Sequence, residues 1–252
     1  GAVAVAARAA PAAADPPRPA DLLLDALVTT FTQGHAAGVP AVRRASAAFL
    51  PPPETGTPAA GGSDDCRWLW LAGRTAMSVF DDETVLALAA RHVRLARGAG
   101  ALATLPAALL VQSVMMVLVG DFPRAADRMA IAATTGTAPV LHARLILAAW
   151  RGRPDEAAEI HATLVREAAG PGLHTEDSLT QYALAVLHNG LGDHPAALVA
   201  ATRAFEACEL THSNLAHSEL VEAACRTGHP ERAASALDEL ESRARASGAP
   251  WG

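Results

Sequence analysis

Lysine is absent from this sequence of 252 residues, in which all 20 basic side chains are arginine. A Walker A loop places a lysine against nucleotide phosphates, and Schiff-base catalysis uses a lysine amine as its nucleophile. The sequence therefore excludes both functions for this chain. The formal net charge of −6 also argues against direct nucleic-acid binding, which needs a clustered basic surface.

Cysteine is scarce as well, and its three positions do not suggest a metal site. Cys66, Cys208 and Cys225 lie far apart, and none belongs to a Cys-x-x-Cys zinc motif. An odd number of widely spaced cysteines indicates buried, reduced thiols. We therefore expect a cytoplasmic protein.

Aromatic residues make up only 4% of the chain, which weakens one enzymatic interpretation. Asp81, Asp82 and Glu83 resemble half of the metal cluster of terpene-cyclase-type all-α enzymes, but those enzymes stabilise cations with aromatic pockets. The alternative is that the three acids follow Phe80 at the start of a helix, where they suit the helix dipole. A small all-α metal-dependent enzyme is the least favoured function, and it predicts a divalent metal at the three acids.

The longest uncharged stretch, residues 98–120, has enough residues to span a bilayer. It contains Gly98, Gly100, Pro106 and Gln112, however, and it ends in a glycine motif that recurs along the chain. A buried central helix explains this composition better than a membrane span.

The recurring motif has its fullest copy at residues 189–198 (NGLGDHPAAL). Related copies begin at Gly120 (GDFPRAA), Gly152 (GRPDEAA) and Gly228 (GHPERAA). In each copy we expect a glycine to end one helix, a polar or Pro-containing link to turn the chain, and an Ala-rich helix to follow. The glycines of the copies, Gly120, Gly152, Gly192 and Gly228, recur at irregular intervals of 32, 40 and 36 residues. These intervals are close to the length of about 34 residues of a tetratricopeptide repeat.

Apolar residues form 51% of the chain, and the commonest of them is alanine, the strongest helix former. Alignment of the copies on Gly120, Gly152, Gly192 and Gly228 places an alanine five residues after each glycine, at Ala125, Ala157, Ala197 and Ala233. Mostly apolar residues follow on the same helical face. The sequence therefore predicts an all-α fold, a tetratricopeptide-like superhelix of about six antiparallel helix pairs.

The expected organisation is a single repeat domain over residues 20–252. Residues 1–19 end in a Pro-rich stretch and are interpreted as a linker or the tail of a preceding element. Residues 51–63 are rich in Pro, Gly and Thr and predict a disorder-prone loop.

Helices are predicted before and after that loop from their apolar periodicity. The first runs from about Ala20 to Gln33, and the second begins at about Pro40. A helix from near Asp82 carries its apolar residues on one face. We expect Arg91, Arg94 and Arg97 on the opposite, polar face.

No catalytic, cofactor-binding or metal-ligating set emerges from the sequence. Glu209 and His212 have the Glu-x-x-His spacing of di-iron bundles, but the second such motif is missing. In helical repeats the first helices of the pairs usually line the concave binding face. The candidate binding residues on that face are Gln112, Met116, His142, Arg144, Tyr182, Asn189 and His217. Trp68, Trp70 and Trp150 are interpreted as packing anchors.

Several phrases, in order along nearly the whole chain, are similar to a known family. They are Pro19 to Asp25 (PADLLLD), Asp65 to Arg74 (DCRWLWLAGR), Phe80 to Thr84 (FDDET), Arg91 to Arg97 (RHVRLAR), Leu147 to Gly152 (LAAWRG), Tyr182 to Gly192 and Ala246 to Trp251 (ASGAPW). Together they resemble the tetratricopeptide-like helical region of large ATP-binding LuxR-type (LAL, MalT-like STAND) transcriptional regulators of actinobacteria.

The resemblance implies a sensor and scaffold fragment without catalytic activity or cofactor of its own. In that family an ATPase precedes the helical region and a DNA-binding helix-turn-helix follows it, and this chain carries the motifs of neither. The implied partners are an effector, another protein or the regulator's other domains, with a homo-oligomer as a further option. The alternative function is a free-standing helical-repeat module that binds a peptide or a partner protein.

Overall fold

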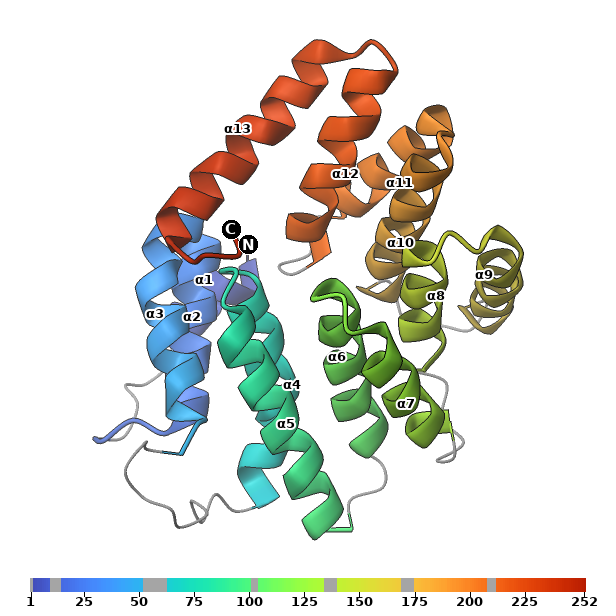
Figure 1. Cartoon of the computed structure of the whole chain (residues 1–252). Coiled ribbons are helices and arrows are strands. Elements are labelled where there is room, and N and C mark those ends of the chain that lie inside the picture. Colours follow the sequence, from blue (N-terminus) through green and yellow to red (C-terminus); the bar gives the residue numbers. More distant parts are fainter. Residues whose placement is uncertain are drawn as a thin grey trace. The chain divides into compact units, whose positions relative to one another are not determined.

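The computed structural model describes residues 2–9, 15–51, 63–100, 104–133, 140–168, 175–207 and 212–252. Within these ranges the regular secondary structure is helical throughout and no strand occurs, which confirms the all-α prediction (Figure 1). Most of the loop predicted at residues 51–63 lies outside the described ranges, and so do Cys208 and Glu209.

The chain forms two compact units, although the sequence predicts one repeat domain. Unit 1 comprises residues 1–108 together with residues 242–252, and unit 2 comprises residues 109–241. The helix α13 (Pro230–Ser247) contributes its last residues to unit 1, because the unit boundary falls after Glu241.

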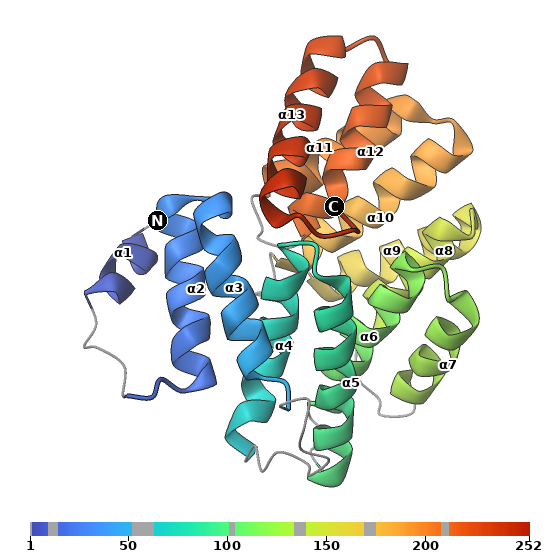
Figure 2. The same ribbon diagram turned by 60° about the vertical axis from the view of Figure 1, so that its left-hand side comes forward.

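Unit 1 is built from paired helices. They are α1 (Ala2–Arg8), α2 (Pro19–Gln33), α3 (His35–Ala48), α4 (Ser63–Met77) and α5 (Asp82–Gly98), followed by the start of α6 (Leu105–Leu118). α2 packs along α3, and α4 packs along α5 (Figure 2). Their shared core contains Leu23, Val42, Phe49, Leu69 and Leu88, all of them buried. α1 lies within residues that the sequence predicts as a linker.

Unit 2 continues with α7 (Phe122–Ala133), α8 (Val140–Trp150), α9 (Pro154–Ala168), α10 (Thr175–Leu191), α11 (His194–Glu206) and α12 (His212–Arg226). α10 packs against α8 and α12 and also against α11. Three of the helices that precede glycine motifs, α8, α10 and α12, therefore lie side by side, with α10 in the middle. Small buried residues such as Ala185, Ala200 and Ala201 allow these helices to approach closely.

The four glycine motifs are helix-ending turns, as predicted. Gly120, Gly152, Gly192 and Gly228 all have φ between 63° and 82°, the left-handed region that favours glycine. After Gly192 the backbone N–H of Asp193 reaches back to the His188 carbonyl at 2.9 Å. The Asp193 carboxylate then accepts a hydrogen bond from the Ala196 N–H at 3.2 Å and begins α11.

The buried face that follows each glycine is confirmed at its first position. Ala125, Ala157, Ala197 and Ala233 are all at most 4% exposed. The pattern weakens in α13, where Leu237 is 50% exposed and Ala236 is buried instead. The last copy therefore presents a different face to its neighbours.

A fifth turn of the same kind joins α4 to α5, with phenylalanine in the glycine position. Phe80 has φ 57°, and the N–H of Asp81 reaches back to the Ala76 carbonyl at 3.3 Å. The Asp81 carboxylate accepts a hydrogen bond from the Thr84 N–H at 3.1 Å. Asp81 thus caps α5, as the helix-start interpretation of the three acids predicts. A search of the sequence for the glycine motif misses this copy, because Phe80 stands where the other copies have glycine.

Four expectations need correction or comment. Cys225 is exposed, whereas the sequence predicts a buried thiol. Arg91 is buried rather than on a polar face, and its guanidinium donates a hydrogen bond to the Phe49 carbonyl. α3 begins at His35, earlier than Pro40, because the chain turns directly at Gly34. The uncharged stretch is divided, since α5 ends at Gly98 and α6 begins at Leu105. In the described part of the chain, no helix has both the length and the apolar character for a membrane crossing.

Candidate functional site

A polar group of side chains lies in unit 2, where α8, α10 and α12 are neighbours. On α10, the Asn189 amide Nδ2 donates to the Glu219 carbonyl oxygen at 3.1 Å and to its carboxylate Oε2 at 2.9 Å. Tyr182 lies two turns earlier on α10 and interacts with the charge of Glu219. Its hydroxyl oxygen accepts a hydrogen bond from Trp150 of α8. We call Trp150, Tyr182, Asn189 and Glu219 the Glu219 cluster.

The repeat turn fixes the position of Asn189 in this cluster. Gly192 ends α10, and its N–H donates to the Asn189 carbonyl oxygen at 3.0 Å. The side-chain Oδ1 of Asn189 lies 3.4 Å from the Nδ1 of His194, the first residue of α11. The amide is therefore oriented by the turn itself and directs its N–H groups toward α12.

Burial sets the electrostatics of the cluster. It raises the pKa of Glu219 above the ordinary value of a glutamate; the hydrogen bond from Asn189 opposes this shift and the Glu222 carboxylate adds to it. Burial also raises the pKa of Tyr182, with a further contribution from the charge of Glu219, so this phenol stays neutral. Among the described residues, no arginine or histidine forms an ion pair with Glu219.

This arrangement is suited to binding. Glu219 accepts one side-chain hydrogen bond from Asn189, and no cation among the described residues compensates for its partial burial. A positively charged nitrogen group would form a charge-assisted hydrogen bond with such a carboxylate. Trp150 is 41% exposed and offers an aromatic surface at the edge of the cluster.

The structure brings together two of the seven residues predicted for a concave face. Tyr182 and Asn189 both belong to the Glu219 cluster. None of the described contacts connects the other five predicted residues to this cluster. Of these, Met116 is half-buried and Arg144 is exposed, whereas Gln112, His142 and His217 are buried.

His217 shows how such a buried residue is accommodated. Its ring is fully buried and packs edge-on against Phe205, with ring centroids 5.0 Å apart. Its Nε2 lies 3.7 Å from the Oε1 of Glu239. This environment favours a packing role for His217 within unit 2.

Two members of the cluster were missed by the sequence reasoning. Glu219 stands one turn before Glu222 on α12, and a repeated acid on a helix that must pack is a signal that could have identified it. Trp150 is predicted as a packing anchor, but 41% of it is exposed, and Trp70 is 36% exposed. Trp68, by contrast, is half-buried.

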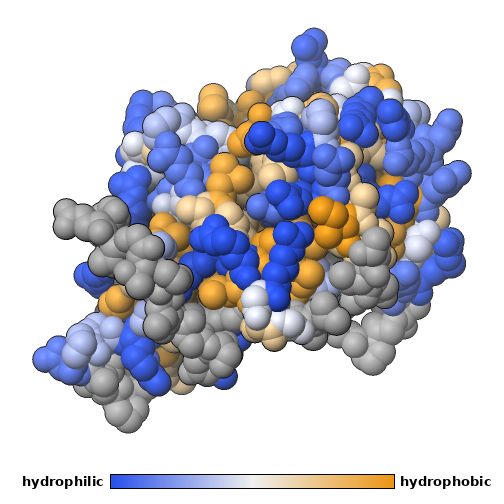
Figure 3. Space-filling view, turned by 60° about the horizontal axis from the view of Figure 1, so that its bottom comes forward, coloured by the Kyte–Doolittle hydropathy of each residue, from blue (hydrophilic) through white to orange (hydrophobic). Residues whose placement is uncertain are grey.

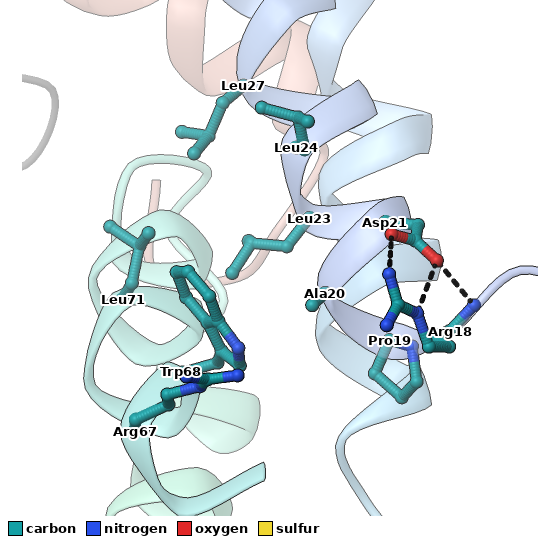
Figure 4. A pocket seen from close by; sticks show the side chains of 10 residues that line it. All are labelled: Arg18, Pro19, Ala20, Asp21, Leu23, Leu24, Leu27, Arg67, Trp68 and Leu71. Atoms are coloured by element: carbon teal, nitrogen blue, oxygen red, sulfur yellow. Dashed lines mark hydrogen bonds and ion pairs between the residues drawn. The ribbon is translucent and has the colours of Figure 1, made fainter. Parts of the chain in front are cut away.

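A second candidate binding site is a pocket of about 270 Å³ in unit 1, between α2 and α4. In Figure 4, Leu23, Leu24 and Leu27 of α2 face Trp68 and Leu71 of α4. These walls are apolar, so the pocket suits an apolar group.

Charged side chains at the mouth of this pocket interact with its own residues. Arg18 pairs with Asp21 at 3.0 Å, and the Arg67 guanidinium lies over the Trp68 ring, 5.3 Å from its centroid. Figure 3 shows that apolar side chains also reach the surface elsewhere, among hydrophilic ones. The pocket is therefore less distinctive than the partly buried carboxylate of the Glu219 cluster.

Comparison with known proteins adds no further candidate. No protein-family model matches the chain, and no curated protein or solved structure is significantly similar to it.

Proposed function

We propose that this chain is a non-catalytic sensor and scaffold, the tetratricopeptide-like region of a LuxR-type regulator, and that it binds an effector or partner at the Glu219 cluster. The regulator assignment rests on the sequence resemblance. The binding assignment rests on one observation, a partly buried carboxylate on α12, beside α10, that forms no ion pair with any described arginine or histidine. In this proposal the helix pairs form one superhelix, and the controlled ATPase and DNA-binding domains lie outside this chain.

The chemistry of the cluster indicates what the effector or partner presents. A guanidinium or ammonium group would offset the burial of Glu219 and lower its pKa again. The Trp150 ring, 41% exposed, provides a further contact for such a group. The ligand is therefore a positively charged molecule or a peptide that contains arginine or lysine.

The position of the cluster suggests how binding would be communicated. Asn189 and Glu219 join α10 to α12, and Trp150 and Tyr182 join α8 to α10. A ligand that contacts all three helices binds best in one arrangement of them and shifts the population toward it. That arrangement would bias the regulator's neighbouring domains.

Thermal shift measurements on the chain test the binding assignment. Short peptides with one arginine are compared with the same peptides carrying citrulline, a neutral analogue of the same shape. We expect an arginine peptide to raise the melting temperature more than its citrulline match, because only the charged form pairs with Glu219. Glu219→Gln should abolish the difference.

The matched control is Glu206→Gln, which removes the same charge from an exposed glutamate on α11 that pairs with Arg232 at 3.5 Å. This variant should retain the preference for arginine. If no peptide pair is distinguished, or if Glu206→Gln has the same effect as Glu219→Gln, the site is not the Glu219 cluster. Calorimetry with magnesium ATP tests the division of labour separately, because nucleotide binding to this chain would contradict it.

A further inference from the structure

The segment of residues 247–252, which follows the body of α13, packs onto the turn between α4 and α5 within unit 1. The Ser247 hydroxyl donates to the Val79 carbonyl oxygen at 2.5 Å. Arg43 of α3 donates to the Ser247 carbonyl oxygen at 2.6 Å. Ser247 is 2% exposed, so both of its hydrogen bonds are shielded from water. The segment thus satisfies a carbonyl group that the end of α4 leaves without a helical partner.

The same segment covers the aromatic ring of Phe80. Phe80 and Trp251 meet edge to face, with ring centroids 6.2 Å apart and planes at 69°. The Gly252 backbone also lies against the Phe80 ring, since a Cβ there would be 3.1 Å from its atoms. Phe80 is only 6% exposed as a result.

Phe80 needs such support because its backbone is unfavourable. Among the described residues it is the one non-glycine residue with positive φ. A bulky side chain in this region is strained, whereas glycine adopts it freely. At the corresponding Gly120, Gly152, Gly192 and Gly228, an added Cβ would meet nothing within 4 Å. The α4–α5 turn is therefore the copy in which a side chain occupies this position and packs against a residue from elsewhere in the chain.

We propose that residues 247–252 form a releasable strap whose docking holds the left-handed turn at Phe80, so that strap release changes the conformation of the α4–α5 turn. The strap has a natural hinge in Gly248, whose φ is 59°, immediately after α13 ends. Gly248 and Pro250 are exposed. This device does not depend on the binding of a ligand at the Glu219 cluster.

Hydrogen exchange of the α4–α5 turn, followed by mass spectrometry on the full chain, tests the proposal. Trp251→Ala should accelerate exchange of the turn peptide roughly tenfold, the factor that matches the left-handed penalty of a residue with a side chain. In a Phe80→Gly background the same Trp251→Ala change should have no further effect, because glycine needs no support there. Phe80→Asn, which also tolerates positive φ, provides a second background if Phe80→Gly fails to fold.

Trp70→Ala is the matched control, because it removes a partly exposed tryptophan from α4 of the same unit. It should leave exchange of the turn unchanged. Two results overturn the strap: Trp251→Ala leaves the turn peptide unchanged in the Phe80 chain, or it accelerates exchange equally in the Phe80 and Phe80→Gly chains. The first result means that the turn needs no strap, and the second that the segment acts without Phe80.

Discussion

Two glycines that stand two residues apart should respond to alanine in opposite directions. Gly190 lies within the last turn of α10, whereas Gly192 follows the helix with φ 79°. An added Cβ would meet nothing within 4 Å at either position, so the effect of each substitution comes from the backbone alone. Gly190→Ala gains helix propensity, which is about 0.5 kcal/mol so close to the end of a helix. Gly192→Ala places a side chain in the left-handed region at a net cost of about 1 kcal/mol.

Urea unfolding followed by circular dichroism gives the sign of both changes. The midpoint should rise for Gly190→Ala and fall for Gly192→Ala, with a difference of about 1.5 kcal/mol in unfolding free energy between the variants. Gly192→Asn is the control, because asparagine tolerates this conformation and should lose less stability than alanine. Shifts of both alanine variants in the same direction would refute our description of the repeat turn.

Three further substitutions test individual contacts. Burial raises the pKa of Glu219 in the folded state, so the unfolded state loses this proton at a lower pH than the folded state does. The free energy of unfolding therefore falls as the pH rises from the pKa of the unfolded state toward that of the folded state. Glu219→Gln should remove that fall, so its curve of melting temperature against pH should be flatter above the ordinary pKa range of a glutamate. An unchanged curve would contradict the raised pKa of Glu219. Asn189→Ala removes both hydrogen bonds to Glu219 and should lower the unfolding free energy in urea by about 1–2 kcal/mol; a loss near zero would mean that the turn does not orient the cluster. Arg43→Gln removes the hydrogen bond to the Ser247 carbonyl oxygen and should lower the unfolding free energy by about 1.5 kcal/mol. Arg44→Gln on the same helix breaks only an exposed ion pair and should cost less than about 0.5 kcal/mol. Equal losses would argue against the contact between Arg43 and Ser247.

The helices and the repeat turns could be predicted because local rules determine them. Glycine at the end of an apolar helical pattern has a strong left-handed preference, and Gly120, Gly152, Gly192 and Gly228 all adopt it. The turn at Phe80 escaped prediction because phenylalanine has no such preference. The ring of Phe80 packs against Trp251, a residue that is distant in sequence.

Long-range packing also explains the other differences. Arg91 fits a polar helical face by its spacing, but the Phe49 carbonyl lies within reach and draws the guanidinium into the interior. Asn189 and Tyr182 are predicted because first helices of such pairs usually line the concave face, and both belong to the Glu219 cluster. Glu219 itself was not chosen, because its burial becomes apparent only when α10 and α12 are placed together.

Hydrogen exchange with and without an arginine peptide, the one with the largest thermal shift, tests the central claim most directly. The account predicts slower exchange in α10 near Asn189 and in α12 near Glu219, with no such effect from the citrulline match. Protection confined to the pocket between α2 and α4, or protection by both peptides alike, would contradict a binding site at the Glu219 cluster.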